Sequence, residues 1–216
     1  MAILIVAATE LEIAPFLPMA GAELECMVHG IGSGSTSYHL THTLCKRSFD
    51  LVIQTGIAGS YTNGPTPGEA VIVTQDRYAD LGIEENGCFI PLEKMGFTSF
   101  NKYPFSEGQL INPWIKKINT ADVRLVSGAT VNLVHDDAVR IQKLTDQFHP
   151  EIETMEGAPF HQVCMMENIP FLQIRGISNV VGVRDKTQWI VHQAIQSATV
   201  LVEDVLMKLK TGKLWK

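Results

Sequence analysis

Short apolar runs of strand type alternate with segments of helical periodicity along this chain, and this alternation constrains the fold more than any other feature. We predict strands at Ala2–Ala8, Leu24–Val28, Asp50–Thr55, Glu69–Thr74, Val123–Ser127 and in the segment IPFLQIRGI that Pro170 opens. Helices are expected after the glycine-rich segment HGIGSGS, at Asp136–Gln147, within Glu153–Asn168 and over Lys186–Lys210. This order predicts a mostly parallel sheet with helices on both faces.

The composition favours a small-molecule partner over nucleic acid or membrane. The chain has 216 residues, a net charge of -6 and no stripe of basic residues interleaved with aromatics. Its length fits one domain spanning 1–216. The apolar start runs directly into Glu10 and Glu12, which is typical of a strand and not of a signal peptide. The four cysteines lack CxxC spacing and suit free thiols, so we expect a cytoplasmic protein.

The stretch from Glu153 to Asp185 is the part that the other elements are expected to serve. Its first half has apolar residues at helical spacing, starting with Met155, and its second half is a buried strand. Glu156 is placed at the start of this helix, and Ser178 and Asn179 just past the end of the strand. Ligands bind at the carboxyl ends of strands in open α/β sheets, so these polar residues mark a candidate site.

Two glycine-rich segments follow predicted strands and leave two interpretations open. GIGSG passes into a helix with Ser33, Ser35 or Thr36 available as its cap, and GIAGS follows the strand at Asp50–Thr55. Neither segment has the spacing GxGxxG or GK[ST] of a nucleotide-binding loop. Each alone predicts a tight turn, whereas together they could bring backbone amides close to a ligand.

The candidate catalytic groups are carboxylates. Glu12, Glu156 and Asp185 each suit a solvated or capping role, but two carboxylates brought together from strand ends suggest cleavage of a glycosidic bond. The chain lacks HExxH and GxSxG motifs, so we expect neither a metal nor another cofactor, and no serine or cysteine nucleophile.

The order ATELE, HGIGSG, QTGIAGS, GEAVIVTQDRYAD, ETMEG and RGISN resembles the purine nucleoside phosphorylase and nucleosidase superfamily over nearly the whole chain. It is most similar to the 5'-methylthioadenosine/S-adenosylhomocysteine nucleosidases, and the segment ISNVVGVRD is similar to that of the futalosine hydrolases. The resemblance implies a three-layer α/β/α fold with a central mixed, mostly parallel twisted sheet. It also implies a homodimeric enzyme that binds a purine nucleoside.

The resemblance implies roles for particular residues. Glu12 would activate the attacking water, and Glu156 would hold the ribose hydroxyls with Met155 beside the sugar. Asn179 would stand at the leaving base, and Ser178 would be a substrate-binding residue. The ribose and base would be lined by Ala58 and Gly59, and the purine would meet Val131 and Asn132.

Two departures from relatives bear on the chemistry. Gln54 stands where phosphorylases carry an arginine for phosphate, so water is the expected nucleophile. Asn179 stands where adenine-specific nucleosidases carry an aspartic acid. An amide cannot act as a general acid, but its NH2 group can donate to N7 and O6 of a 6-oxopurine, which favours hypoxanthine; the same amide could also serve adenine through N6 and N7.

The resemblance further implies a cation for the benzoate of futalosine. Arg184 is the candidate, with Asp185 orienting it and Trp189 or His192 lining the aryl pocket, although a helix cap explains Arg184 and Asp185 equally well. Arg175 is expected to form a structural ion pair. The resulting hypothesis is hydrolysis of futalosine to hypoxanthine. Its rivals are a methylthioadenosine/adenosylhomocysteine nucleosidase that releases adenine, and a purine-nucleoside binding module without activity.

Overall fold

The computed structural model of the chain describes residues 1–216 apart from 97–99, 101 and 121. Its strands are β1 (Ile3–Ala7), β2 (Leu24–Val28), β3 (Leu51–Gln54), β4 (Ile57–Ser60), β5 (Ala70–Asp76), β6 (Gly82–Glu85), β7 (Cys88–Pro91), β8 (Leu110–Ile111), β9 (Leu125–Thr130), β10 (Ile152–Thr154) and β11 (Phe171–Val180). Its α-helices are α1 (Glu10–Ile13), α2 (Ser33–Leu44), α3 (Ala138–Phe148), α4 (Gly157–Met166) and α5 (Val191–Lys210). Its 3-10 helices are η1 (Ala14–Met19), η2 (Leu92–Lys94), η3 (Ile115–Lys117) and η4 (Lys186–Gln188).

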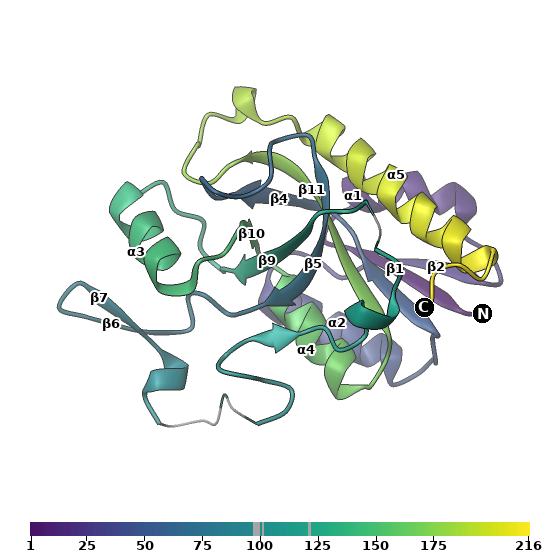
Figure 1. Cartoon of the computed structure of the whole chain (residues 1–216), viewed down its shortest axis with the longest axis horizontal. Coiled ribbons are helices and arrows are strands. Elements are labelled where there is room, and N and C mark those ends of the chain that lie inside the picture. The colour runs from purple at the N-terminus through teal and green to yellow at the C-terminus, as the bar shows by residue number, and fades with distance from the viewer. Residues whose placement is uncertain (97–99, 101, 121) are drawn as a thin grey trace.

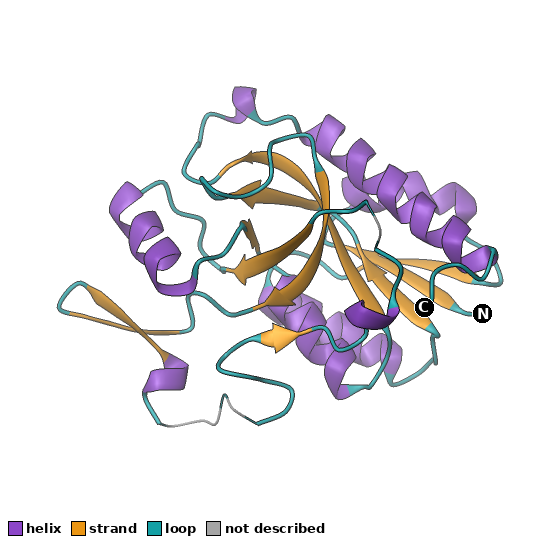
Figure 2. Cartoon of the chain, in the orientation of Figure 1, coloured by secondary structure: helices purple, strands orange, loops and turns teal. Residues whose placement is uncertain are grey.

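The central sheet is buried between two layers of helices (Figures 1 and 2). Successive side chains of a strand point to opposite faces, and β1 supplies both cores. Ile5 packs in a cluster with Val202 of α5, whereas Val6 packs in a second cluster with Leu40 of α2 and Phe160 of α4. Because both faces are covered, β1 is apolar at every position. The predicted α/β/α layering is therefore confirmed.

The sheet is mixed and mostly parallel, as predicted. Its strand order is β2-β1-β3-β11-β4-β10-β9-β5-β8, with antiparallel pairs at β10–β4, β11–β5 and β5–β8. The strand β11 pairs with β3 and β4 in parallel and also with β5, so this half of the sheet curls back on itself. In Figure 1, β11 accordingly runs through the middle of the molecule.

The parallel register of β1, β3 and β11 brings three chain segments to one edge of the sheet. Val6 is aligned with Gln54, and Gln54 with Gln173. Each strand then leads into a different segment: β1 into α1 with Glu12, β3 into Gly56, and β11 onward to Arg175. The candidate site is assembled at this edge, as expected for the carboxyl ends of parallel strands.

Several predicted boundaries were wrong. Ser178 and Asn179 lie within β11, because Asn179 and Val180 still pair with Gly59 and Ser60. The last four residues of the segment GIAGS therefore form the strand β4 and not a turn. Met155 precedes α4, and the short strand β10 stands in the region assigned to the helix.

The cap of α2 also differs from the prediction. Gly32 is the N-cap residue, with φ at 86°, and no side chain caps the helix. The candidate caps bond elsewhere: the Ser35 hydroxyl donates to the carbonyl of His29, and the Thr36 hydroxyl to that of Gly32. Glycine is required here because a positive φ is costly for residues with a Cβ.

Residues 77–108 contain an antiparallel hairpin, formed by β6 and β7, while residues 97–99 and 101 of this region lie outside the described residues. None of the helices in the described part of the chain is long and apolar enough to span a membrane.

Candidate active site

Glu12 is the carboxylate that follows the first strand, and the structure turns it inward. It lies in α1, whose N-cap Thr9 accepts from the amide of Glu12 at 3.4 Å. The carboxylate accepts from the Thr9 hydroxyl at 2.7 Å and from the amide of Ile57 at 3.0 Å. Glu12 is only 7% exposed. Its carboxylate therefore lies against β4 and does not face solvent, although it stands at the start of a helix.

Gly56 separates Glu12 from a buried guanidinium. With φ at 151°, it adopts a backbone conformation that favours glycine. A Cβ at this position would lie 2.6 Å from Oε1 of Glu12 and 2.9 Å from Nη1 of Arg175. The first glycine of QTGIAGS, Gly56, is thus explained by the close approach of its backbone to two charged side chains.

Glu156 is the second carboxylate of the site. It is the N-cap residue of α4 and is 5% exposed. Its Oε1 accepts from the amide of Gly32 at 3.1 Å, and its Oε2 lies 3.8 Å from Nη2 of Arg175. Burial raises the pKa of Glu156 while Arg175 lowers it, and the charge of Glu12 raises it further. The two distant acids of the sequence are therefore brought within electrostatic reach of each other.

Arg175 is the functional candidate that the sequence interpretation assigned to structure alone. It has the predicted ion pair, with Glu156, and it also donates to Oε1 of Gln54 at 2.7 Å. It is 1% exposed in β11. A fully buried cation must be paired, and an arginine within a ten-residue buried strand was the signal that could have identified it.

His29 and Gln54 extend this network behind Arg175. Nδ1 of His29 lies 2.8 Å from the carbonyl of Gly30, and its Nε2 lies 3.1 Å from Nε2 of Gln54. These contacts fit a neutral ring that donates from Nδ1 and accepts the Gln54 amide hydrogen, which leaves Oε1 of Gln54 to accept from Arg175. Burial lowers the pKa of His29 to about 4, in agreement with the neutral form.

The end of β11 places Ser178 and Asn179 beside β4. The Ser178 hydroxyl lies 2.7 Å from Oδ1 of Asn179 and 3.2 Å from the carbonyl of Ala58, which is 4% exposed. Nδ2 of Asn179 donates to the carbonyl of Val180 at 3.0 Å. Asn179 pairs with Gly59 in the sheet, and a Cβ on Gly59 would lie 3.5 Å from Nδ2 of Asn179. Hydrogen bonds and strand pairing therefore bring four of the predicted substrate-site residues together: Ala58, Gly59, Ser178 and Asn179.

The segment after β9 connects to the same region through the start of α2. The carboxylate of Asp80 accepts from the backbone amide of Asn132 at 2.5 Å and from its Nδ2 at 3.2 Å. Oδ1 of Asn132 accepts from the amide of Ser33 at 3.4 Å. Because Gly32 bonds to Glu156, the start of α2 joins the Asn132 segment to the second carboxylate. Val131 is buried and Met155 is half-buried.

Among the described residues, no hydrogen bond or ion pair links Arg184 or Asp185 to Glu12 or Glu156. Arg184 is exposed, with its guanidinium carbon 5.9 Å from the ring centre of Trp189. Asp185 caps η4, accepting from the amide of Thr187 at 3.0 Å and from the side chain of Gln188 at 3.0 Å. The capping interpretation therefore holds for Asp185, whose carboxylate is engaged by residues other than Arg184.

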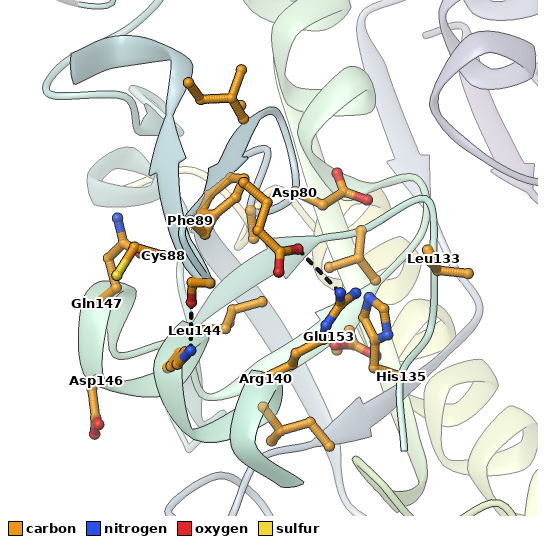
Figure 3. A pocket seen from close by; sticks show the side chains of 18 of the residues that line it. Asp80, Cys88, Phe89, Leu133, His135, Arg140, Leu144, Asp146, Gln147 and Glu153 are labelled. Atoms are coloured by element: carbon orange, nitrogen blue, oxygen red, sulfur yellow. Dashed lines mark hydrogen bonds and ion pairs between the residues drawn. The ribbon is translucent and has the colours of Figure 1, made fainter. Parts of the chain in front are cut away.

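A pocket of about 650 Å³ opens between the β6–β7 hairpin and α3 (Figure 3). Val131 and Glu153 line it, and the Tyr61 hydroxyl donates to Glu153 at 2.7 Å. Neither Glu12 nor Glu156 belongs to its lining. The pocket thus adjoins the Val131 segment and is separate from the carboxylates. Within the described residues, no group of three His, Cys, Asp or Glu side chains is arranged to hold a metal ion.

Comparison with known proteins identifies the family to which this arrangement belongs. The family model described as "Phosphorylase superfamily" matches residues 15–209. The chain belongs to the phosphorylase superfamily. The family membership that the sequence motifs indicated is thereby confirmed. The expectation that the chain is a purine-nucleoside enzyme is confirmed with it, as a property of the family.

Individual members of the phosphorylase superfamily resemble this chain over most of its length. A futalosine hydrolase from Thermus thermophilus is 28% identical over 185 residues, covering 82% of this chain and 78% of its own. A 5'-methylthioadenosine/S-adenosylhomocysteine nucleosidase from Pseudoalteromonas translucida is 28% identical over 170 residues, which cover 76% of this chain and 70% of that nucleosidase. Among solved structures, a nucleosidase of the latter kind from Colwellia psychrerythraea, in complex with adenine, has a TM-score of 0.78 at 18% identity and covers 97% of this chain and 96% of its own.

Proposed function

We propose that this protein hydrolyses the N-glycosidic bond of futalosine and releases hypoxanthine. The observation that carries the proposal is the pair of buried carboxylates, Glu12 and Glu156: Arg175 forms an ion pair with Glu156, and Gly56 lies between Arg175 and Glu12. Cleavage of a glycosidic bond needs a base for water and negative charge near an oxocarbenium-like sugar, and this pair can supply both.

Glu12 is the proposed general base. Its carboxylate accepts from the Thr9 hydroxyl and the Ile57 amide, so its orientation is fixed before substrate binds. Each carboxylate oxygen has more than one lone pair, which leaves capacity to accept a proton from water. A preorganised base of this kind contributes about 100- to 10,000-fold to a rate.

Glu156 is proposed to hold the ribose hydroxyls, with Met155 beside the sugar. The positive charge of Arg175 favours the ionised form of Glu156, although burial has the larger effect and raises the pKa of this carboxyl above its ordinary value. An ionised carboxylate accepts two hydroxyl hydrogens and so favours a ribose over a deoxyribose.

Water as nucleophile is supported by what surrounds the site. A phosphate dianion needs arginine donors, and the side chain that stands in the phosphorylase position is Gln54, which is committed to His29 and Arg175. Arg175 faces Glu156. The positive charge nearest the carboxylates is therefore already balanced.

Asn179 is proposed to steady the leaving purine, and its chemistry favours hypoxanthine. Its amide can donate to N7 and O6 of a 6-oxopurine, and hydrogen bonds to these atoms stabilise the departing anion. The Ser178 hydroxyl, 2.7 Å from Oδ1 of Asn179, orients the amide. One hydrogen of Nδ2 is donated to the carbonyl of Val180, and the other is left for the base, shared between N7 and O6. Ala58, Gly59, Val131 and Asn132 complete the proposed base and ribose contacts.

Adenine release from 5'-methylthioadenosine is the second candidate, favoured by the relatives that carry that name and by the adenine-bound Colwellia structure. The two candidate reactions differ in whether the leaving base needs a proton from a general acid: adenine release needs one, whereas departing hypoxanthine can be stabilised by hydrogen bonds alone. Changing Asn179→Asp restores an acid, so we expect adenine release to rise and hypoxanthine release to fall. An unchanged ratio of the two bases would remove Asn179 from the account of specificity.

The reaction type is tested by incubating futalosine with the protein in ¹⁸O-labelled water, with and without phosphate. Hydrolysis predicts one labelled oxygen at C1 of the sugar product and a rate independent of phosphate. A sugar 1-phosphate, or a rate that requires phosphate, would contradict hydrolysis. Binding of futalosine without release of base would instead support a binding module.

A further inference from the structure

Asp76, at the end of β5, is a buried carboxylate with no part in the proposed chemistry. It is 1% exposed. Its Oδ1 accepts from the amide of Arg77 and the hydroxyl of Thr130, both at 2.8 Å, and its Oδ2 from Nε2 of Gln173 at 3.3 Å. Burial raises its pKa to about 6 although these donors lower it. A buried acid costs stability relative to an apolar side chain, so its presence calls for a role beyond packing.

Thr130 connects Asp76 to the first turn of α4. The Thr130 hydroxyl donates to Asp76 and accepts from the amide of Ala158 at 2.7 Å. The neighbouring amide of Gly157 donates to the hydroxyl of Thr154 at 3.1 Å. The first free amides of α4 are therefore satisfied by threonines of β9 and β10, and not by a side chain of the helix itself.

This external capping leaves the side chain of Glu156 free. An N-cap side chain usually accepts from the amides of the first turn, but Glu156 makes no such bond. Its carboxylate instead accepts from the amide of Gly32 and faces Arg175. The position of this carboxylate thus depends on how β9 and β10 hold the first turn of α4.

Two glycines leave the space that Asp76 fills. A Cβ on Gly157 would collide with Oδ2 of Asp76 and with Nε2 of Gln173, and a Cβ on Gly128 would lie 2.5 Å from the same Oδ2. The carboxylate therefore packs directly against the backbone of the helix start. A negative charge is also favoured at this place because the N-terminus of α4 carries a partial positive charge.

We propose that Asp76 is a positioning residue for Glu156. Its carboxylate fixes the Thr130 hydroxyl as a donor toward Oδ1, which directs a lone pair of that hydroxyl to the amide of Ala158 and anchors the first turn of α4. The inference rests on the proposed function, in which Glu156 binds the ribose. It follows that loss of the Asp76 charge weakens contacts to the sugar and leaves contacts to the base intact.

The test is Asp76→Asn, which keeps the shape and removes the charge. We expect kcat/KM for futalosine to fall about tenfold, because Oδ1 of the asparagine still accepts from Thr130 but without the charge that strengthens this hydrogen bond, while inhibition by free hypoxanthine stays within about twofold of the wild type. Asp204→Asn, at a half-buried position of α5 where the carboxylate pairs with Lys208 at 2.7 Å, is the control and should change neither quantity. Equal weakening of futalosine and hypoxanthine would show general damage and overturn the proposal.

A double-mutant cycle with Glu156→Gln tests whether Asp76 acts through Glu156. Asp76→Asn should lower the residual kcat/KM of the Glu156→Gln variant by much less than tenfold. An equal loss in the wild-type and Glu156→Gln backgrounds would contradict the proposal.

If Asp76→Asn does not fold, Thr130→Val and Thr130→Ser replace it, and only Thr130→Val should impair turnover. A fully active Glu156→Gln would refute the proposed function itself. An inactive Glu156→Gln beside a folded, fully active Asp76→Asn would refute only this inference.

Discussion

Nη2 of Arg175 lies 3.8 Å from Oε2 of Glu156, and both side chains are almost completely buried. Because neither charge is solvated, each depends on the other and on the polar groups around it. The amide of Gly32 and the side chain of Gln54 supply those groups. This pair is the electrostatic centre of the site, and it explains why a charged residue stands inside β11.

Removal of the cation should destabilise the protein. Arg175→Met leaves Glu156 buried without its partner, and we expect the free energy of unfolding at pH 7 to fall by roughly 3 kcal/mol. Urea denaturation measures this change. Arg184→Met, at an exposed position, is the control and should leave stability nearly unchanged. Equal stabilities of the Arg175 and Arg184 variants would mean that the buried pair contributes nothing.

Replacement of the proposed base should abolish most of the activity without unfolding the protein. For Glu12→Gln we expect turnover of futalosine to fall by about 100- to 10,000-fold, because the amide cannot accept a proton from water. The amide oxygen can still accept from Ile57 or Thr9, so stability should change little. Glu10→Gln, two residues away and exposed, is the matched control. Near-normal turnover of Glu12→Gln would show that another group activates water.

Gly56 should be required for activity as well as for stability, because an alanine is strained at a φ of 151°. A Cβ there would lie 2.6 Å from Oε1 of Glu12, and a flexible side chain can yield where backbone cannot. We therefore expect Gly56→Ala to displace the carboxylate and to lower kcat by at least about tenfold, in line with the sensitivity of catalysis to small displacements. Gly21→Ala, with no atom within 4 Å of the added carbon, should be fully active. Comparable kcat values in both variants would argue against the close approach.

Stability should depend on pH through His161, which is fully buried in α4 with Nδ1 2.9 Å from the carbonyl of Leu110. Burial lowers its pKa from 6.5 to about 4. The unfolded chain therefore binds a proton at a higher pH than the folded protein, and this contribution to stability is present above pH 6.5 and lost as the pH falls toward 4. Between pH 7 and 5 the loss is about 2 kcal/mol.

The variant His161→Asn isolates this effect, because its Nδ2 can still donate to Leu110. Urea denaturation at both pH values should show a smaller loss on acidification for the variant than for the wild type. Asp76, whose pKa is raised to about 6, contributes in the opposite direction in both proteins and cancels in the comparison. Identical losses in both proteins would mean that His161 titrates normally when folded.

Much of the sheet could be predicted from the sequence, because buried strands appear there as short runs of apolar residues. The strand Leu24–Val28 was predicted with its observed bounds. The strands β8 and β10 were missed because two or three residues carry no periodicity. The extension of β11 to Val180 was missed because its pairing with β4 is long-range and polar residues do not indicate strand.

The candidate site was predictable only where residues share a recognised motif. The motifs indicated Glu12 and Glu156, and the structure brings both to one buried region. An ion pair was predicted for Arg175, but its partner, and any role for Asp76, could not be assigned, because a single charged residue in a strand does not specify its partner and these partners lie far away in sequence. Thr130 is 54 residues from Asp76, and Gln54 is 121 residues from Arg175. Such pairings become visible only when the strands are placed side by side.

The measurement that tests the central claim most directly is chromatography of the free base released from futalosine and from 5'-methylthioadenosine, in parallel and without phosphate. The account predicts hypoxanthine from futalosine and little adenine from 5'-methylthioadenosine, with both signals abolished by Glu12→Gln. Adenine release at a rate equal to or above that of hypoxanthine would contradict the assigned substrate. Absence of any base from either nucleoside would contradict the proposed enzyme altogether.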